Sequence, residues 1–349
     1  MTIQPADLSL AATPEDVGGP MYPPGRWLRM SPLTWFVVRR VFLGVVTLVV
    51  VSVVIFAATE LLPGNAAQAI LGLTATPARL HAMENQLHLN EPVYTQYWDW
   101  FSGLFSGHLG HSLVNGRSVS SLLSDRVVNS LILVVLAGVI GTLIAIFVGL
   151  YSALHRGRWF DEILGVSTLA LAALPEFVIA IALVILFATL VFHWLPPVSI
   201  VPPGQTALSN PKLLILPVMT LVLATIPYTI RMLRASAIEV LESEYVVMAR
   251  LKGVGPRRIL LRHVVPNALP STVQVIALVF SWLAGGVVLV EYVFNYPGVG
   301  QAFVDAVANR DVPVVQALAL ILAGFYVVMN LCADLAAVLL SARTRTSLQ

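Results

Sequence analysis

The chain has 349 residues, of which 58% are hydrophobic and only 11% are charged. A soluble globular domain carries about 25% charged residues, so this composition excludes an ordinary soluble protein. The net charge of +2 provides no basic field for nucleic acid, and a single cysteine, Cys332, excludes a disulfide framework.

Residues 1–34 are rich in proline, glycine and small residues and contain no long apolar run. A signal peptide needs an apolar core, so we interpret this stretch as a flexible cytoplasmic tail. Six apolar blocks follow, each long enough for the roughly 20 residues that cross a bilayer as a helix. The predicted fold class is therefore an all-α integral membrane protein with six transmembrane helices, at 35–61, 128–154, 161–192, 212–233, 272–293 and 313–341.

The distribution of Lys and Arg predicts the orientation of these spans, because short cytoplasmic loops are enriched in both residues. With the N-terminus inside, the inner segments hold 15 of the 20 basic residues. The outer segments hold the other five, which are Arg79, Arg117, Arg126, Lys212 and Arg310. We therefore expect both termini and the loop 235–270 to be cytoplasmic.

The outer loop 62–127 is too long for a simple connector and is expected to form a cap on the outer face. It contains a cluster of aromatic residues, Tyr94, Tyr97, Trp98, Trp100, Phe101 and Phe105. Trp and Tyr favour the membrane–water boundary, so these side chains either anchor the loop there or form a docking surface for an external partner.

Ionisable residues inside spans are costly, so each one is a candidate for function. Glu176 falls near the middle of the third span and follows Pro175, which interrupts the helical hydrogen bonds. The pair either lines a wet substrate pathway, or Glu176 is a hydrogen-bonded acid that locks two helices together. In the last span, we expect Asp334 to pack against another helix or to pair with Arg343.

The cytoplasmic stretch Glu244–Pro270 is basic and nearly free of long apolar runs. Leu241, Tyr245 and Met248 recur at helical spacing, and Arg250 and Lys252 place positive charge in the last turn of the predicted helix.

Gly253 then stands where a left-handed C-terminal cap needs a residue without a Cβ atom. Pro256 suits the first position of a second short helix, which we expect Pro266 and Pro270 to end. The prediction is a short helix, a tight glycine turn and another short helix at the membrane surface.

This stretch resembles the cytoplasmic EAA loop of ATP-binding-cassette (ABC) importer permeases, in the form typical of dipeptide and oligopeptide permeases. The residues that carry the resemblance are Glu244, Tyr245, Val246, Ala249, Arg250, Lys252, Gly253, Asn267, Ala268 and Leu269. Segments 89–113 and 290–316 also resemble this family, so the likeness extends from about residue 35 to the C-terminus. Glu176 departs from it, because a small or polar residue is more typical there.

The resemblance implies a type I ABC importer (MetI-like) transmembrane domain in a prokaryotic inner membrane, with residues 128–345 as the core permease domain. Such a permease pairs with a second, usually non-identical permease to form the pore. Two cytoplasmic ATPases would dock on the coupling loop 235–270, through Glu244, Tyr245, Ala249, Arg250, Lys252 and Gly253. They would hold ATP and Mg, while an external binding protein delivers peptides.

The resemblance therefore implies a chain that carries no cofactor or metal and is not an enzyme. Consistent with this, the sequence contains no phosphate-binding loop, no HExxH and no Cys-x-x-Cys motif. Related permeases import nickel, glutathione or other small solutes, which remain alternatives to peptides. A proton-coupled secondary transporter that uses Glu176 and Asp334 as a relay is an alternative of a different class.

Overall fold

The computed structural model describes residues 32–60, 76–86, 90–202 and 205–340. The predicted tail, residues 1–34, lies almost entirely outside this part of the chain. Apart from one isolated bridge between His111 and Ser118, the described residues form no β-structure. Their α-helices are α1 (Pro32–Glu60), α3 (Pro77–Gln86), α4 (Val93–Phe105), α5 (Val119–Leu154), α6 (Trp159–Ala173), α7 (Glu176–Val184), α8 (Lys212–Leu241), α9 (Glu244–Leu251), α10 (Pro256–Ile259), α11 (Val265–Val293), α12 (Val299–Ala308) and α13 (Val312–Leu340).

Among the described helices, α1, α5, α8, α11 and α13 are long and apolar enough to cross a membrane. The expected third span, 161–192, is not one helix: α6 and α7 meet at an angle of 106° and make a sixth span only if the bent pair is counted as one. Pro175 explains the break, because it forces Leu174 into an extended conformation with ψ of 130°. The all-α class is confirmed, and the third span is corrected.

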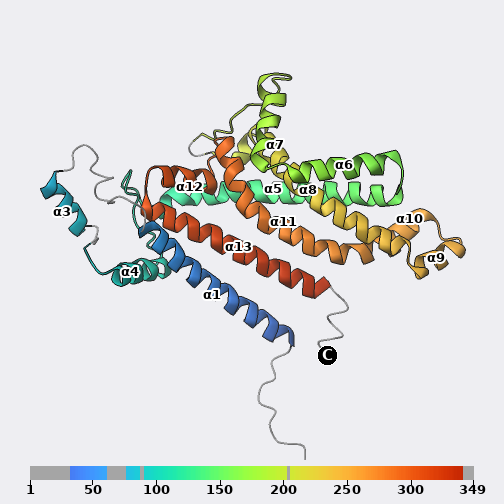
Figure 1. The fold of residues 1–349 in the computed structure, drawn as a ribbon, viewed down its shortest axis with the longest axis horizontal. Coiled ribbons are helices and arrows are strands. Elements are labelled where there is room, and N and C mark those ends of the chain that lie inside the picture. The colour runs from blue at the N-terminus through green and yellow to red at the C-terminus, as the bar shows by residue number, and fades with distance from the viewer. Residues whose placement is uncertain (1–31, 61–75, 87–89, 203–204, 341–349) are drawn as a thin grey trace, which may run out of the picture.

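Helix α8 lies at the centre of the bundle and packs against α5, α11, α6 and α7. Leu133 of α5, Leu221 of α8 and Leu283 of α11 are almost fully buried in the largest apolar cluster. Helix α1 lies along α13 at one side, and α9 and α12 lie toward opposite ends of the molecule (Figure 1). We call these ends the α9 end and the α12 end.

Asp334 of α13 forms an ion pair with Arg40 of α1, at 3.1 Å between Nη1 and Oδ2. Packing of Asp334 against another helix is therefore correct, but its partner is Arg40 and not the expected Arg343, which lies outside the described residues. Toward the other end of the same two helices, the buried Gln316 amide donates to the Thr59 hydroxyl at 2.8 Å. Two polar contacts thus fix α1 against α13.

Glu291, close to the end of α11, is completely buried. Its carboxylate accepts hydrogen bonds from the Ser130 hydroxyl at 2.5 Å and from the Gly300 N–H at 2.6 Å. A Cβ atom at residue 300 would lie 2.3 Å from the Cα of Val288, so only glycine fits this approach. The carboxylate therefore ties α12 to α5 and α11.

Tyr296 closes the turn between α11 and α12, where its hydroxyl donates to the carbonyl of Asn129 at 2.9 Å. Burial raises the pKa of Tyr296, with the nearby Glu291 adding to the effect. The phenol therefore stays protonated and remains a donor.

The aromatic cluster of the long outer loop lies on α4. Tyr97 and Trp100 contact Phe56 of α1, with ring centroids 5.4 and 5.9 Å away, and the Tyr97 hydroxyl is 2.9 Å from that of Ser52. The opposite side of α4 exposes Tyr94, Trp98 and Phe105. One half of the cluster thus fastens α4 to α1, and the other half is free for a membrane boundary or a partner.

Candidate functional site

Helix α9 forms the first half of the predicted helix–turn–helix. Glu244 lies in its first turn and Arg250 in its last turn, so both charges complement the helix dipole. Val246 is completely buried among Leu233, Ile259 and other residues of a small apolar cluster at the α9 end. This one side chain anchors the short helix to α8 and to the start of the next helix.

The outward side of α9 is apolar. Tyr245, Met248 and Leu251 follow one another at intervals of three residues and are 48%, 55% and 78% exposed. Residues three apart share one side of a helix, so they form a continuous stripe. The sequence predicted Leu241 as a member of this stripe. Leu241 is instead half-buried at the end of α8, and Leu251 is the third member of the exposed stripe.

The turn after α9 has the conformation that the sequence predicts. Gly253 has φ of +77°, and its N–H donates to the carbonyl of Arg250 at 2.9 Å. The left-handed region is unfavourable for residues with a Cβ atom, although no atom crowds the Cβ position here. The backbone conformation alone therefore favours glycine at this position. The preceding residue, Lys252, is the C-cap of α9.

The second half of the motif differs from the prediction. Pro256 begins α10 as expected, but the chain continues through a π-helical turn, Leu260–Val264, directly into α11. Pro266 and Pro270 do not end the helix. Pro266 lies in the first turn of α11, where a missing N–H is tolerated, and the wider turn before it relieves the usual clash with the preceding carbonyls. The turn is consequently linked to a long span without an intervening loop.

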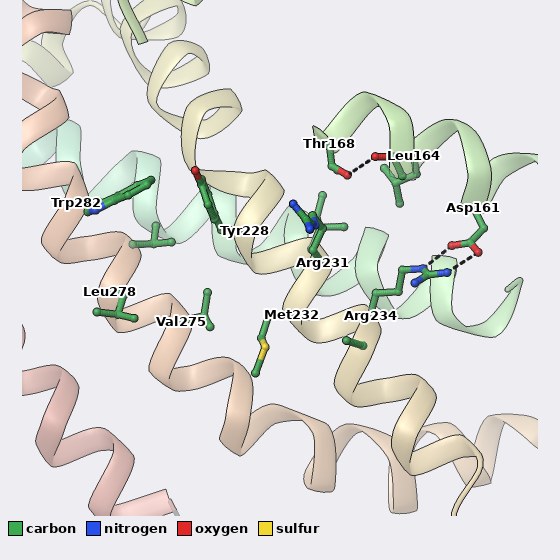
Figure 2. Close-up of a pocket in the computed structure, with 14 residues that line it drawn as sticks. Asp161, Leu164, Thr168, Tyr228, Arg231, Met232, Arg234, Val275, Leu278 and Trp282 are labelled. Carbon is green, nitrogen blue, oxygen red and sulfur yellow. Dashed lines mark hydrogen bonds and ion pairs between the residues drawn. The ribbon is translucent and has the colours of Figure 1, made fainter. Parts of the chain in front are cut away.

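A cavity of about 910 Å³ lies between α6, α8 and α11 (Figure 2). Figure 2 shows Tyr228, Arg231 and Arg234 in succession along α8, with Trp282, Leu278 and Val275 along α11. The Tyr228 and Trp282 rings meet edge to face at 4.9 Å, and Trp282 is 54% exposed. The walls combine apolar side chains with two arginines, as is common in binding cavities.

One ion pair forms part of the cavity wall. Arg234 donates from Nε and Nη2 to the two carboxylate oxygens of Asp161, at 2.6 and 2.7 Å. Asp161 is 6% exposed and also accepts from the Ser152 hydroxyl and from the Gly157 N–H. This bidentate geometry joins α6 to α8 and α5. Sequence reasoning missed the pair, and the only signal was an acid in the first turn of an apolar helix.

Arg231 differs from Arg234, three residues away on α8. Its side chain lines the cavity and is exposed. No carboxylate of the described residues pairs with it. The cavity therefore contains one neutralised cation and one that is available to a ligand.

Glu176 and Pro175 lie at the bend between α6 and α7. Pro175 is the N-cap of α7 and Glu176 occupies its first turn, so Glu176 is not in the middle of a continuous span as expected. The carboxylate is half-buried against α11, where its Oε1 is 3.3 Å from the position that a Cβ of Gly286 would take. Neither residue lines the cavity itself. Gly286, against which Glu176 packs, lies one helical turn beyond Trp282 on α11.

The described residues contain no group of three or more His, Cys, Asp or Glu side chains placed to hold a metal ion. The site consists instead of an exposed helix, a rigid connection to α11 and a cavity between spans. These features define the class of protein: a polytopic membrane protein with an exposed apolar helix at one end and a cavity between its spans.

Comparison with known proteins gives the family. The binding-protein-dependent transport system inner membrane component matches residues 128–346, and the N-terminal part of the corresponding membrane component matches residues 33–134. The chain belongs to this family, which confirms the ABC importer permease that the sequence resemblance indicated. It is thus a multi-pass inner-membrane protein.

Individual relatives match over nearly their whole length. A probable peptide ABC transporter permease of Sinorhizobium fredii is 34% identical over 310 residues, covering 89% of this chain and 99% of the relative. A putative peptide transport system permease of Brucella abortus is 34% identical over 315 residues, covering 90% and 99%. A glutathione transport system permease of Escherichia coli K12 is 32% identical over 299 residues, covering 86% and 95%.

Proposed function

We propose that this chain is a permease subunit of an ATP-driven importer of dipeptides and oligopeptides, and forms half of its translocation pore. The observation that carries the proposal is the arrangement of α9: one buried anchor, Val246, an exposed apolar stripe and a direct link into α11. A short helix of this kind fits a groove on a soluble partner.

The partner in this proposal is an ABC ATPase on the cytoplasmic side, one for each of two permeases in the complex. Tyr245 would enter its groove with Met248 and Leu251, while Glu244, Ala249, Arg250, Lys252 and Gly253 form and orient the docking helix. ATP and Mg are held by the ATPases. The second permease is a non-identical subunit, and a peptide-binding protein docks on the opposite side.

Transport follows from the link between the docking helix and the cavity. When the ATPases close on ATP, they pull α9 and, through the turn and α10, the whole of α11. The ion pair of Asp161 with Arg234 holds α6 to α8, so these two helices would move together and α11 would move relative to them. The cavity, with Glu176 and Pro175 beyond its rim, would then open to each side in turn.

Glutathione is a second candidate substrate, because one relative is named as a glutathione permease. Glutathione is itself a small charged peptide, so it would use the same cavity. A proton-coupled carrier is disfavoured, because the exposed helix α9 would then have no role.

The test is reconstitution of the complete complex in proteoliposomes, with its binding protein supplied outside. We expect loaded binding protein to stimulate ATP hydrolysis, and peptide uptake to require ATP. Uptake that continues without ATP on a proton gradient alone would contradict the proposal. If ATP hydrolysis is stimulated by glutathione but not by any peptide, the substrate is glutathione and the ATP-driven import mechanism still stands.

A further inference from the structure

The ring pair of Tyr228 and Trp282 separates two unpaired charges of opposite sign. Helix α8 runs toward the α9 end and α11 runs away from it, so the two helices are antiparallel. Arg231 lies three residues beyond Tyr228 toward the α9 end. Gly286, which contacts the carboxylate of Glu176, lies four residues beyond Trp282 toward the α12 end.

Arg231 lines the cavity, and Glu176 lies just beyond its edge on the side of Trp282 that faces the α12 end. On α11, Val275, Val279, Trp282 and Gly286 recur at intervals of three and four residues, so they share one side of the helix. The first three line the cavity, and Gly286 extends the same side to Glu176. On α8, Tyr228, Arg231 and Ala235 all line the cavity with the same spacing.

Helix geometry gives the separation of the charges. A rise of 1.5 Å per residue over three residues of α8 and four of α11 places Glu176 and Arg231 about 10 Å apart along the bundle axis. An extended chain spans about 3.3–3.6 Å per residue, so this distance corresponds to about three residues of peptide. The ring pair lies between the two charges, where a middle side chain of such a peptide would pack.

Neither charge has an ion-pair partner among the described residues, whereas Arg234 in the same wall is fully paired with Asp161. A peptide with free ends carries an ammonium and a carboxylate, and both lose hydration in a largely apolar cavity. Each would need a counter-charge there. Glu176 and Arg231 are the two available groups, with the signs and the spacing that these ends require.

We propose that the permease itself selects zwitterionic peptides of about three residues and holds them in one orientation. The free amino end lies toward Glu176, the free carboxylate toward Arg231, and the middle residue against Tyr228 and Trp282. This inference rests on the proposed function, because it gives the cavity a specific peptide ligand. It goes further by assigning terminal recognition to the membrane subunit and not only to the binding protein.

The test compares three radiolabelled peptides in proteoliposomes with the complete complex and its binding protein: trialanine, N-acetyl-trialanine and trialanine amide. Each is measured with wild type, Glu176→Gln and Arg231→Gln. The binding protein contributes the same preference to every permease, so the change in uptake ratio between permeases isolates the contribution of the cavity. Glu162→Gln and Lys212→Gln are controls, because they remove the same charges from exposed positions outside the cavity.

We expect Glu176→Gln to reduce the preference for trialanine over N-acetyl-trialanine about tenfold and to leave the preference over the amide unchanged. Arg231→Gln should reduce the preference for trialanine over trialanine amide and leave the preference over N-acetyl-trialanine unchanged. The two control variants should change neither preference. If both variants lose uptake of all three peptides equally, the proposed orientation is wrong, but the proposed function of the wild type as a peptide importer still stands. Absence of ATP-dependent uptake of any peptide by wild type would overturn the proposed function and this inference with it.

Discussion

Gly253 and Gly255 stand two residues apart in the same turn but have different backbone conformations. Gly253 has φ of +77°, whereas Gly255 has φ of −65°, which any residue adopts. A Cβ atom at either position would meet nothing within 4 Å. The two positions therefore separate the effect of conformation from the effect of added bulk.

We expect Gly253→Val to uncouple ATP hydrolysis from transport. A left-handed conformation costs a residue with a Cβ atom about 1–2 kcal/mol, so the turn would be populated roughly 5–30-fold less. The measurement is peptide uptake per ATP hydrolysed by the reconstituted complex. Gly255→Val is the matched control and should keep the wild-type ratio, while Gly253→Asn should recover part of it because Asn tolerates this conformation. Normal coupling in Gly253→Val would remove the assigned role of the turn.

The ion pairs of Asp161 and of Arg156 differ in burial. Asp161 is 6% exposed and receives two bonds from Arg234, whose side chain is 34% exposed. Arg156 pairs with Glu242 at the surface, where the side chains are 55% and 65% exposed. Removing one partner from a buried pair leaves an uncompensated charge, whereas an exposed pair contributes little.

Asp161→Asn should therefore lower the free energy of unfolding of the permease by about 2–3 kcal/mol, somewhat less than for a fully buried pair. Glu242→Gln should change it by less than about 1 kcal/mol. Thermal unfolding of the purified complex in detergent measures both. Equal stability of the two variants would show that the Asp161 pair does not hold α6 to α8.

At the scale of elements, helix α12 depends on a carboxylate from another helix. Glu291 of α11 accepts hydrogen bonds from Ser130 of α5 and from the N–H of Gly300 in α12. Glu291→Ala should leave these buried donors without a partner, at a cost of about 1–3 kcal/mol for each. The melting temperature of the complex should fall, and protease cleavage between α11 and α12 should become faster.

Glu60→Ala is the control for that change, because Glu60 is exposed at the end of α1. It should leave both measurements near wild type. Unchanged stability of Glu291→Ala would mean that α12 is held by its apolar contacts alone.

Apolar blocks and glycine chemistry made much of this fold predictable. Block lengths located five spans, although α5 begins nine residues earlier and α8 ends eight residues later than expected. Gly253 predicted the turn and its left-handed conformation. The helix through Pro266 and Pro270 could not be foreseen, because local rules end a helix there and only packing and the π-helical turn keep it continuous. The contacts of Asp161 with Arg234 and of Glu291 with Ser130 could not be predicted either, because the partners lie 73 and 161 residues away in the sequence.

The bend at Pro175 could be predicted only in part from the sequence. The sequence predicts that proline interrupts the backbone hydrogen bonds, but the angle of 106° depends on how α7 packs against α8 and α11. Glu176 was expected near the middle of a continuous span, but it lies in the first turn of α7. Its position beside Gly286, one turn from Trp282, follows only from the packing of two distant helices.

At the scale of the whole molecule, α9, the turn, α10 and α11 follow one another without a long loop (Figure 1). They connect the exposed stripe on α9 to the cavity wall on α11. Movement of a docked partner would reach α11 through two short helical segments. Helix α6 would stay with α8, because Asp161 fastens it to Arg234, so α11 would move relative to both helices. The cavity between these helices should therefore change its access when the partner changes state.

A cysteine in the cavity wall reports that change. Leu278 lines the cavity and is 57% exposed, so Leu278→Cys in a Cys332→Ala background places one thiol there. We expect a membrane-impermeant maleimide to label it from one side without nucleotide, and labelling from that side to fall severalfold when the complex is trapped with ATP. Adding Gly253→Val should abolish the nucleotide dependence, because the docked helix would no longer pull α11 in a fixed direction.

Leu208→Cys is the control, because Leu208 is exposed on a short helical turn away from the cavity and should label equally in both states. If Leu278→Cys labels equally with and without ATP while transport is normal, α11 is not the moving wall of the pathway.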